Sequence, residues 1–181
     1  MIIIFTGNGK GKTSAALGIA LRSLGWERSI CIIQFIKGNK EVGEWKFLNE
    51  IVKLLNYQIV IKQFGDDKKL SITEKGILDN PEYKKSCEEA WRFTKEMILS
   101  KKYDLVILDE INNALNYKLL NENEVLSFVG ANCCSPNDSD IIFTGRDASQ
   151  SLIDLADMVT EMIETKHPFQ KDISAKKGID Y

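Results

Sequence analysis

The chain has 181 residues, of which 44% are hydrophobic and 28% are charged, and its formal net charge is −2. These values are typical of one soluble globular domain, and the charge balance favours neither nucleic acid nor a membrane surface as a partner. No apolar run approaches the roughly 20 residues that span a bilayer, and no basic leader precedes an apolar segment, so we expect a cytoplasmic protein. The four cysteines lack zinc-binding spacing, and the single histidine, His167, excludes a mechanism that needs two imidazoles.

The chain opens with a buried strand, a glycine-rich turn and the start of a helix. The strand covers Ile2–Phe5, and the turn that follows reads Thr6, Gly7, Asn8, Gly9, Lys10, Gly11, Lys12, Thr13 and Ser14. Alternating glycines let the backbone turn tightly and direct several N–H groups at one anion. Lys12 adds a positive charge, the Thr13 hydroxyl is placed to ligate magnesium, and the helix offers its positive end to phosphate. The segment therefore predicts binding of a nucleoside triphosphate.

This turn departs from the P-loop pattern by one residue. The pattern requires a glycine five residues before Gly11, but that position is Thr6 and Gly7 comes one place late. A loop of altered length can hold the phosphates in a different register. It would then direct a different atom of the nucleotide at the reaction.

The rest of the chain alternates helices with apolar strands. The predicted helices cover Thr13–Leu24, Glu44–Leu55, Pro81–Ile98, Asn121–Gly130 and Ser149–Ala156. The further predicted strands cover Ser29–Ile36, Gln58–Phe64, Asp104–Asp109, Asp140–Thr144 and Met158–Ile163. This alternation predicts a single α/β domain over residues 1–181, a P-loop NTPase-like (RecA-like) three-layer sandwich with a mostly parallel central sheet. Residues 65–81 show no clear hydrophobic periodicity and are expected to form an active-site loop. Residues 164–181 are expected to form a polar C-terminal tail.

Further polar residues follow the strands, and the carboxyl ends of parallel strands meet at one edge of a sheet. Asp109 and Glu110 follow a strand at the position where P-loop proteins hold magnesium, although how the two share the metal stays open. Arg146 follows the next strand and is either a bidentate phosphate ligand or a surface residue. The sequence contains no Gly-x-Ser-x-Gly, no kinase catalytic loop and no histidine-based nucleophile pair. Either ATP drives motion or phosphoryl transfer, or a substrate brings its own nucleophile, and the motifs do not decide between these.

Seven segments together resemble the P-loop ATP:corrinoid adenosyltransferases. In chain order they are Thr6–Thr13, Gln34–Gly38, Val106–Asn112, Thr144–Arg146, Asp154–Met162, Lys166–Phe169 and Gly178–Tyr181. The resemblance implies transfer of the adenosyl group of ATP to the Co(I) of a reduced corrinoid, with release of triphosphate, in adenosylcobalamin synthesis or salvage. Co(I) would be the missing nucleophile and would attack the ribose 5′-carbon. The protein would then mainly position the reactants and neutralise the leaving charge.

The resemblance also implies roles for individual residues. Residues 6–14 would bind ATP with the terminal phosphate deep in the loop, and Lys12 and Arg146 would be catalytic. Mg²⁺ would lie on Thr13, Asp109 and Glu110. The corrinoid, which is cobalamin, cobinamide or cobyrinic acid a,c-diamide, would contact Lys37, Phe64 and Asn112. A flavoprotein reductant and a homodimer are further implications.

Two departures from the family concern the cover of the site. Family members have an N-terminal helical extension, whereas Met1 here directly precedes the first strand, so we expect this cover to be missing or supplied otherwise. Some members place a Phe and Trp pair against the corrin, whereas this chain has Phe64 and no aromatic residue from Gly65 to Pro81. Two alternatives remain: a phosphotransferase or ATPase that shares the P-loop, and a non-catalytic protein that binds ATP or a corrinoid.

Overall fold

Six strands form one sheet in the order β3-β2-β4-β5-β1-β6, and every pairing between them is parallel. The computed structural model describes residues 1–55, 58–65, 81–133, 135, 138–166 and 174–179. Its strands are β1 (Ile2–Thr6), β2 (Ile30–Phe35), β3 (Ile59–Phe64), β4 (Leu105–Asp109), β5 (Asp140–Thr144) and β6 (Met158–Glu161). Its helices are α1 (Lys12–Leu24), α2 (Gly43–Leu55), α4 (Pro81–Leu99), α5 (Ile111–Asn116), α6 (Glu122–Asn132) and α7 (Gln150–Leu155). None of these helices is long and apolar enough to cross a membrane.

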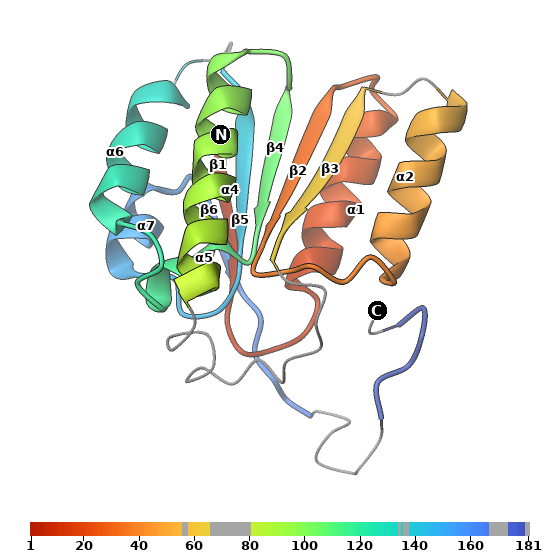
Figure 1. Cartoon of the computed structure of the whole chain (residues 1–181). Helices are drawn as coiled ribbons and strands as arrows, with labels where there is room; N and C mark the ends of the chain where they lie inside the picture. Colours follow the sequence, from red (N-terminus) through yellow and green to blue (C-terminus); the bar gives the residue numbers. More distant parts are fainter. Residues whose placement is uncertain (56–57, 66–80, 134, 136–137, 167–173, 180–181) are drawn as a thin grey trace.

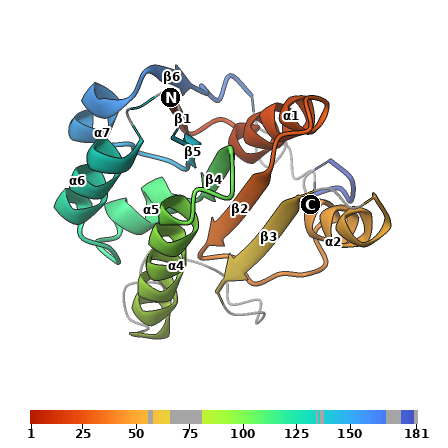
Figure 2. The same cartoon turned by 90° about the horizontal axis from the view of Figure 1, so that it is seen from above.

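Helices cover both faces of the sheet, which gives the three layers seen in Figure 2. Helices α1 and α2 pack on one face, and α4, α5, α6 and α7 pack on the other. Successive side chains of a strand point to opposite faces, so neighbouring residues enter different cores. Ile107 joins the core under α1 and α2, whereas Val106 and Leu108 join the core under the other helices. The unbroken apolar runs of the central strands follow from this two-sided burial.

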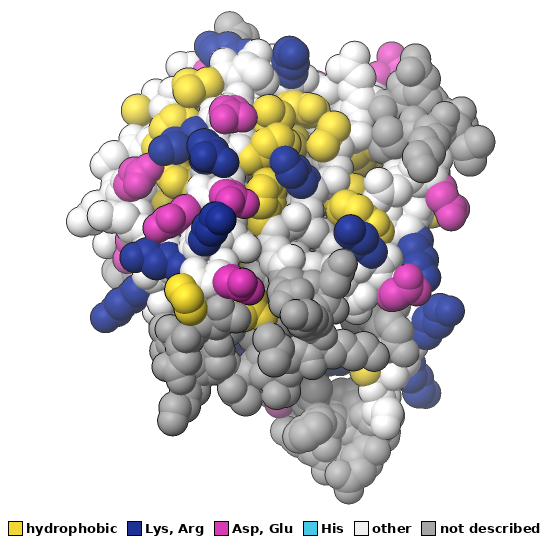
Figure 3. Space-filling model, viewed as in Figure 1, with side chains coloured by type: hydrophobic (Ala, Val, Ile, Leu, Met, Phe, Trp, Pro, Cys, Tyr) yellow, Lys and Arg dark blue, Asp and Glu magenta, His cyan; other side chains and the backbone are white. Residues whose placement is uncertain are grey.

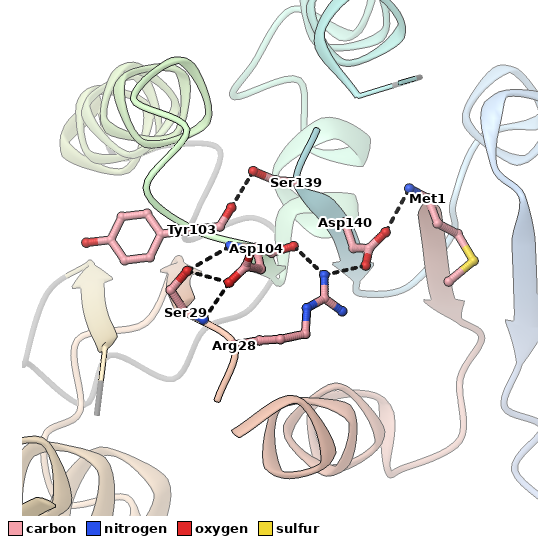
Figure 4. Close-up of polar contacts among 7 residues, drawn as sticks. All are labelled: Met1, Arg28, Ser29, Tyr103, Asp104, Ser139 and Asp140. Atoms are coloured by element: carbon pink, nitrogen blue, oxygen red, sulfur yellow. Dashed lines mark hydrogen bonds and ion pairs between the residues drawn. The ribbon is translucent and has the colours of Figure 1, made fainter. Parts of the chain in front are cut away.

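The amino ends of four strands are joined by a polar network at one edge of the sheet (Figure 4). Asp104 accepts hydrogen bonds from the amide and the hydroxyl of Ser29, each at 2.7 Å. Arg28 donates to the Asp104 carbonyl at 2.9 Å and pairs with Asp140 at 2.7 Å. The amino group of Met1 pairs with the same Asp140 at 2.9 Å. These contacts tie β1, β2, β4 and β5 together at the edge opposite to their carboxyl ends.

The carboxyl ends of the strands all lie along the other edge, at the bottom of Figure 1. The loops after β1 and β5 lie there, together with the segment that follows β6. On the face shown in Figure 3, basic and acidic side chains are interspersed, and the Lys95–Glu124 ion pair at 2.8 Å links α4 to α6. Interspersed charges of this kind produce no strong field of one sign.

The α/β prediction with a parallel sheet is confirmed, but several local predictions are wrong. Helix α5 was not predicted, and α6 continues through Gly130 to Asn132. Gly130 faces α7, where a Cβ would meet Leu155 at an ordinary contact distance of 3.6 Å, and it does not end the helix. Strand β6 ends at Glu161 and not at Ile163, because the chain turns there onto the glycine-rich loop.

The buried cysteines form no disulfide among the described residues. Cys31, Cys87 and Cys133 are buried, and burial raises the pKa of Cys31 and of Cys87 to about 12. These two thiols are therefore protonated at neutral pH and behave as small hydrophobic side chains. Cys134 and residues 66–80, the greater part of the expected active-site loop, lie outside the described residues.

The Asp104 carboxylate should contribute to stability in a pH-dependent way. Hydrogen bonds from the Ser29 hydroxyl and amide lower the pKa of Asp104, so its contribution is present above its ordinary pKa and is lost as the pH falls through the lowered value. We expect Asp104→Asn to reduce the free energy of unfolding by about 1 kcal/mol at neutral pH, since the group is largely exposed. Urea unfolding should show a smaller difference at about pH 3. An equal difference at both pH values would contradict this.

Candidate nucleotide-binding site

The glycine-rich loop between β1 and α1 wraps around the ammonium group of Lys12. Gly7 and Gly11 have φ values of 93° and 107°, in the left-handed region that favours glycine. Lys12 is the first residue of α1, and its Nζ donates to the carbonyls of Gly7 and Gly9, each at 2.7 Å. Burial lowers the pKa of Lys12, against the opposing effect of Glu110. The loop thus holds a buried cation at the start of a helix, as phosphate binding requires.

The loop also packs closely against the segment that follows β6. Gly9 N donates to Met162 O at 2.7 Å, and Met162 N donates to Thr6 O at 2.8 Å. A Cβ on Gly7 or Gly9 would lie 2.5 or 2.8 Å from Met162 O. Both glycines are therefore required by a neighbouring backbone, in addition to any role in phosphate binding.

Thr6, which stands where the P-loop pattern requires glycine, is the last residue of β1. Its hydroxyl accepts a hydrogen bond from Ala148 N at 3.1 Å. Thr6 therefore belongs to the strand, and the turn itself begins at Gly7. Thr6 supports the loop from the β5–α7 side, while Met162 supports it from the β6 side.

Asp109 lies beneath the loop and is the most deeply buried charged group of the site, with 1% of its surface exposed. Its Oδ1 accepts from the hydroxyls of Thr13 at 2.8 Å and Thr144 at 2.6 Å. Its Oδ2 accepts from Gln34 at 3.0 Å and from the Lys37 ammonium at 2.6 Å. Burial alone would raise the pKa of Asp109, but Lys37 and the two hydroxyls outweigh it, so this pKa lies below its ordinary value. The carboxylate is ionised at neutral pH.

Glu110 is the second carboxylate of the site and lines a cavity that lies over the glycine-rich loop. It has a φ of 65° and immediately precedes α5, and its amide donates to the Thr144 hydroxyl at 2.9 Å. Burial raises the pKa of Glu110 and Asp109 adds to this effect, whereas Lys37 opposes it. The two neighbouring carboxylates therefore differ in character, since one is paired and ionised and the other is protonated more readily.

The first turn of α5 holds the loop that carries Arg146. Arg146 N donates to Asn113 Oδ1 at 2.6 Å, and Asn112 Nδ2 donates to Gly145 O at 3.3 Å. Gly145 has a φ of 130°, and a Cβ there would lie 2.6 Å from Asn113 Oδ1. Asn112 itself is 1% exposed, and its contact with Gly145 O directs it at this loop. Asn112 and Asn113 thus position the backbone from which the exposed Arg146 side chain projects.

A cavity of about 440 Å³ lies over the loop. It is lined by Asn8, Gly9, Lys10, Gly11, Lys12, Thr13, Ser14, Lys37, Glu110, Asn113, Arg146 and Ile179. The structure thus brings together most of the residues that we predicted for ATP, metal and catalysis. It does not bring Phe64 to this cavity, because that ring lies in the core against Phe93, with ring centroids 5.7 Å apart.

Sequence reasoning assigned no role to Gln34, Asn113, Thr144 or Met162. Gln34 could have been noticed, because it is the only polar residue between Ile30 and Phe35 in an apolar strand. A single polar side chain in a strand that is buried on both faces requires a hydrogen-bond partner. The contact of Met162 with the loop depends on the pairing of β6 with β1 and leaves no local signal in the sequence.

Fold and site define the class of protein. A parallel sheet with β1, a glycine-rich loop, Lys12 and Thr13 at the start of α1, and Asp109 at the end of β4 is the arrangement of a P-loop NTPase-like protein.

Comparison with known proteins specifies the family. Residues 1–181 match the family model of the ATP:corrinoid adenosyltransferase BtuR/CobO/CobP, and the chain belongs to this family. It is 34% identical over 181 residues to the corrinoid adenosyltransferase of Escherichia coli K12, covering all of this chain and 85% of that protein. It is 35% identical to corrinoid adenosyltransferase CobA of Salmonella typhimurium LT2 with the same coverage. A Sinorhizobium corrinoid adenosyltransferase is 34% identical over 185 residues, which cover this whole chain and 80% of that protein.

Gly7→Ala should destabilise the protein, because the added Cβ would strain a left-handed residue and approach Met162 O to 2.5 Å. We expect a loss of about 2 kcal/mol in the free energy of unfolding, measured with urea. Gly18→Ala is the matched control, since Gly18 lies within α1 and a Cβ there meets no atom within 4 Å. In this control the free energy of unfolding should rise by about 1 kcal/mol, because alanine has a higher helix propensity than glycine. Equal effects of the two substitutions would show that Met162 does not constrain the loop.

Proposed function

We propose that the protein transfers the 5′-deoxyadenosyl group of ATP to the Co(I) centre of a reduced corrinoid and releases triphosphate, in adenosylcobalamin synthesis or salvage. Its membership of the family supports this activity. The observation that carries this proposal is the P-loop whose turn begins at Gly7. It lies beside a cavity lined by cations, and the described lining residues include no histidine or cysteine nucleophile. In the reaction the cobalt–carbon bond forms with the electron pair of Co(I), and the C5′–O bond breaks with its electrons going to triphosphate.

The loop and the surrounding cations would bind the triphosphate. The start of α1 and the loop amides other than that of Gly9, which donates to Met162 O, would face the phosphates, with the terminal phosphate deep in the loop. Lys12 is held by two backbone carbonyls at 2.7 Å, so its ammonium is in position before the substrate arrives. Together with Arg146 it would neutralise charge that develops on the departing triphosphate, which is the main electrostatic demand of the reaction.

The residues present fit a magnesium ion. Hydroxyl and carboxylate oxygens are the ligands that Mg²⁺ prefers, and Thr13 Oγ1 lies 2.8 Å from Asp109 Oδ1 with Glu110 next in the chain. No cluster of three or more His, Cys, Asp or Glu side chains occurs in the part of the chain that the structure describes. The metal would therefore be held by Thr13, Asp109 and Glu110 together with phosphate oxygens and water. Bound there, it would supply positive charge to the triphosphate.

The corrinoid would occupy the open side of the cavity. Lys37 lines this cavity and remains our proposed corrinoid contact, with Ile179 as an apolar neighbour from the C-terminal segment. Asn112 and Phe64 were also predicted to contact the corrinoid, and their burial instead suggests support of the Gly145 loop and of the core. We further propose a cytoplasmic homodimer that receives electrons from a flavoprotein.

Product analysis tests the activity directly. The protein is incubated with ATP, Mg²⁺ and chemically reduced cobalamin or cobinamide, and the visible spectrum is followed. We expect a light-sensitive cobalt–carbon product and inorganic triphosphate. Formation of ADP and phosphate would instead identify a phosphotransferase or an ATPase. Binding without either product would identify a non-catalytic carrier.

Lys12→Ala should lower the rate of adenosyl transfer by at least about 100-fold, because it removes a buried charge that faces the leaving group. The protein should stay folded, as judged by circular dichroism. Lys46→Ala is the matched control, since Lys46 lies on α2 and pairs with Glu41 outside the site. Transfer at the wild-type rate in Lys12→Ala would show that the loop does not bind the reacting triphosphate.

Glu110→Gln should weaken ATP binding only when magnesium is present. The substitution keeps the size of the side chain and removes a charge that would ligate the metal. Calorimetric titration with ATP, with and without Mg²⁺, measures the difference, and we expect a loss of about tenfold in the magnesium-dependent affinity. An unchanged dependence on magnesium would remove Glu110 from the metal site.

A further inference from the structure

The ammonium group of Lys37 lies against two of the side chains to which the proposed function assigns the metal, Asp109 and Thr13. Its Nζ is 2.6 Å from Asp109 Oδ2 and 3.5 Å from Thr13 Oγ1. Neither distance leaves space for a metal ion between Lys37 and these oxygens, and the two cations would repel each other. Lys37 and a metal that is bound directly to both oxygens therefore exclude each other.

Asp109 requires a positive partner in every state of the protein. A buried carboxylate without a counter-charge is costly, and removing one partner of a buried ion pair is strongly destabilising. Thr13, Thr144 and Gln34 donate to Asp109 but carry no charge, so Lys37 is its only charged contact among the described residues. If Lys37 moved away, another cation would have to replace it.

The backbone of Lys37 is tightly packed, whereas its side chain borders the cavity and can move into it. Ile36 has a φ of 57°, and a Cβ on Gly65 would lie 2.7 Å from the Lys37 backbone, so the chain is tightly packed at this turn. The Lys37 side chain is 28% exposed and lines the cavity that also contains Glu110. A rotation about side-chain bonds is therefore sufficient to carry the ammonium from Asp109 into the cavity.

We propose that Lys37 is an exchangeable counter-ion for Asp109, which occupies the metal site when no metal is bound and moves into the cavity when a divalent cation replaces it. This inference rests on the metal ligands of the proposed function. The exchange preserves the charge balance around Asp109. It also delivers a positive charge to the cavity at the step when metal and triphosphate enter. Lys37 is therefore a positioning residue whose location reports whether the metal site is filled.

Competition between Lys37 and the metal can be measured without nucleotide or corrinoid. Lys37→Met keeps a long side chain and removes the charge, and Lys46→Met is the matched control outside the site. Binding of Mn²⁺ is measured by electron paramagnetic resonance, and thermal unfolding is followed with and without Mg²⁺. We expect Lys37→Met to melt about 5 °C or more below wild type without metal. It should bind Mn²⁺ at least about tenfold more tightly, and Mg²⁺ should raise its melting temperature more than that of wild type or Lys46→Met.

The other outcomes of this experiment also decide for or against the exchange. Equal Mn²⁺ affinity in wild type and Lys37→Met would show that the two cations do not compete, and weaker binding in the variant would make Lys37 an aid to metal binding. If neither protein binds Mn²⁺, the metal ligands are wrong as well, while adenosyl transfer is still judged separately by its products. If Lys37→Met is unfolded without metal, recovery on refolding in Mg²⁺, but not in KCl of equal ionic strength, supports the exchange. Failure to recover in Mg²⁺ contradicts it.

Discussion

The buried carboxylate of Asp109 is the constraint on which the carboxyl edge of the sheet depends. It is ionised in a place with almost no access to water, so it must be satisfied by donors that are held in fixed positions. These donors come from the start of α1, from β2 and the turn after it, and from the end of β5. One side chain at the end of β4 thereby sets the relative positions of the phosphate loop, the Lys37 turn and the strand that leads to Arg146.

Two amide side chains connect Asp109 by hydrogen bonds to β3, which is an outermost strand of the sheet. Gln34 is the register partner of both Asp109 and Gln63, so the three side chains form a row across β4, β2 and β3. The carboxylate can only accept, which forces Gln34 to present its NH₂ group to Asp109 and its carbonyl to Gln63 Nε2 at 2.9 Å. Each amide orientation is thus determined by the charge at one end of the row.

The strands and the position of the site were predictable, because apolar runs that end in Gly, Asp or Arg identify buried parallel strands and the edge where their loops meet. Details that depend on long-range packing were not. Helix α5 has only six residues, three of them asparagine, and follows the left-handed Glu110. Its sequence therefore shows no hydrophobic periodicity from which a helix could be predicted. The alternating glycines were interpreted as a phosphate cradle, yet Gly7 and Gly9 are also required by Met162, a residue more than 150 positions away. Asn112 and Phe64 were assigned by family resemblance, which does not report burial.

The charge of the cavity follows from this architecture and suits a reaction in which the substrate brings its own nucleophile. Among the described lining residues, Lys10, Lys12, Lys37 and Arg146 are cationic and Glu110 alone is acidic, although the whole chain has a net charge of −2. Asp109 beneath the cavity is paired with Lys37 and offsets that one cation, so the excess positive charge comes from Lys10, Lys12 and Arg146. A preorganised positive site lowers the energy of a leaving polyanion most where water is excluded. Such a site needs no base or nucleophile of its own when Co(I) makes the attack, and Lys12 and Arg146 can be directed at the triphosphate.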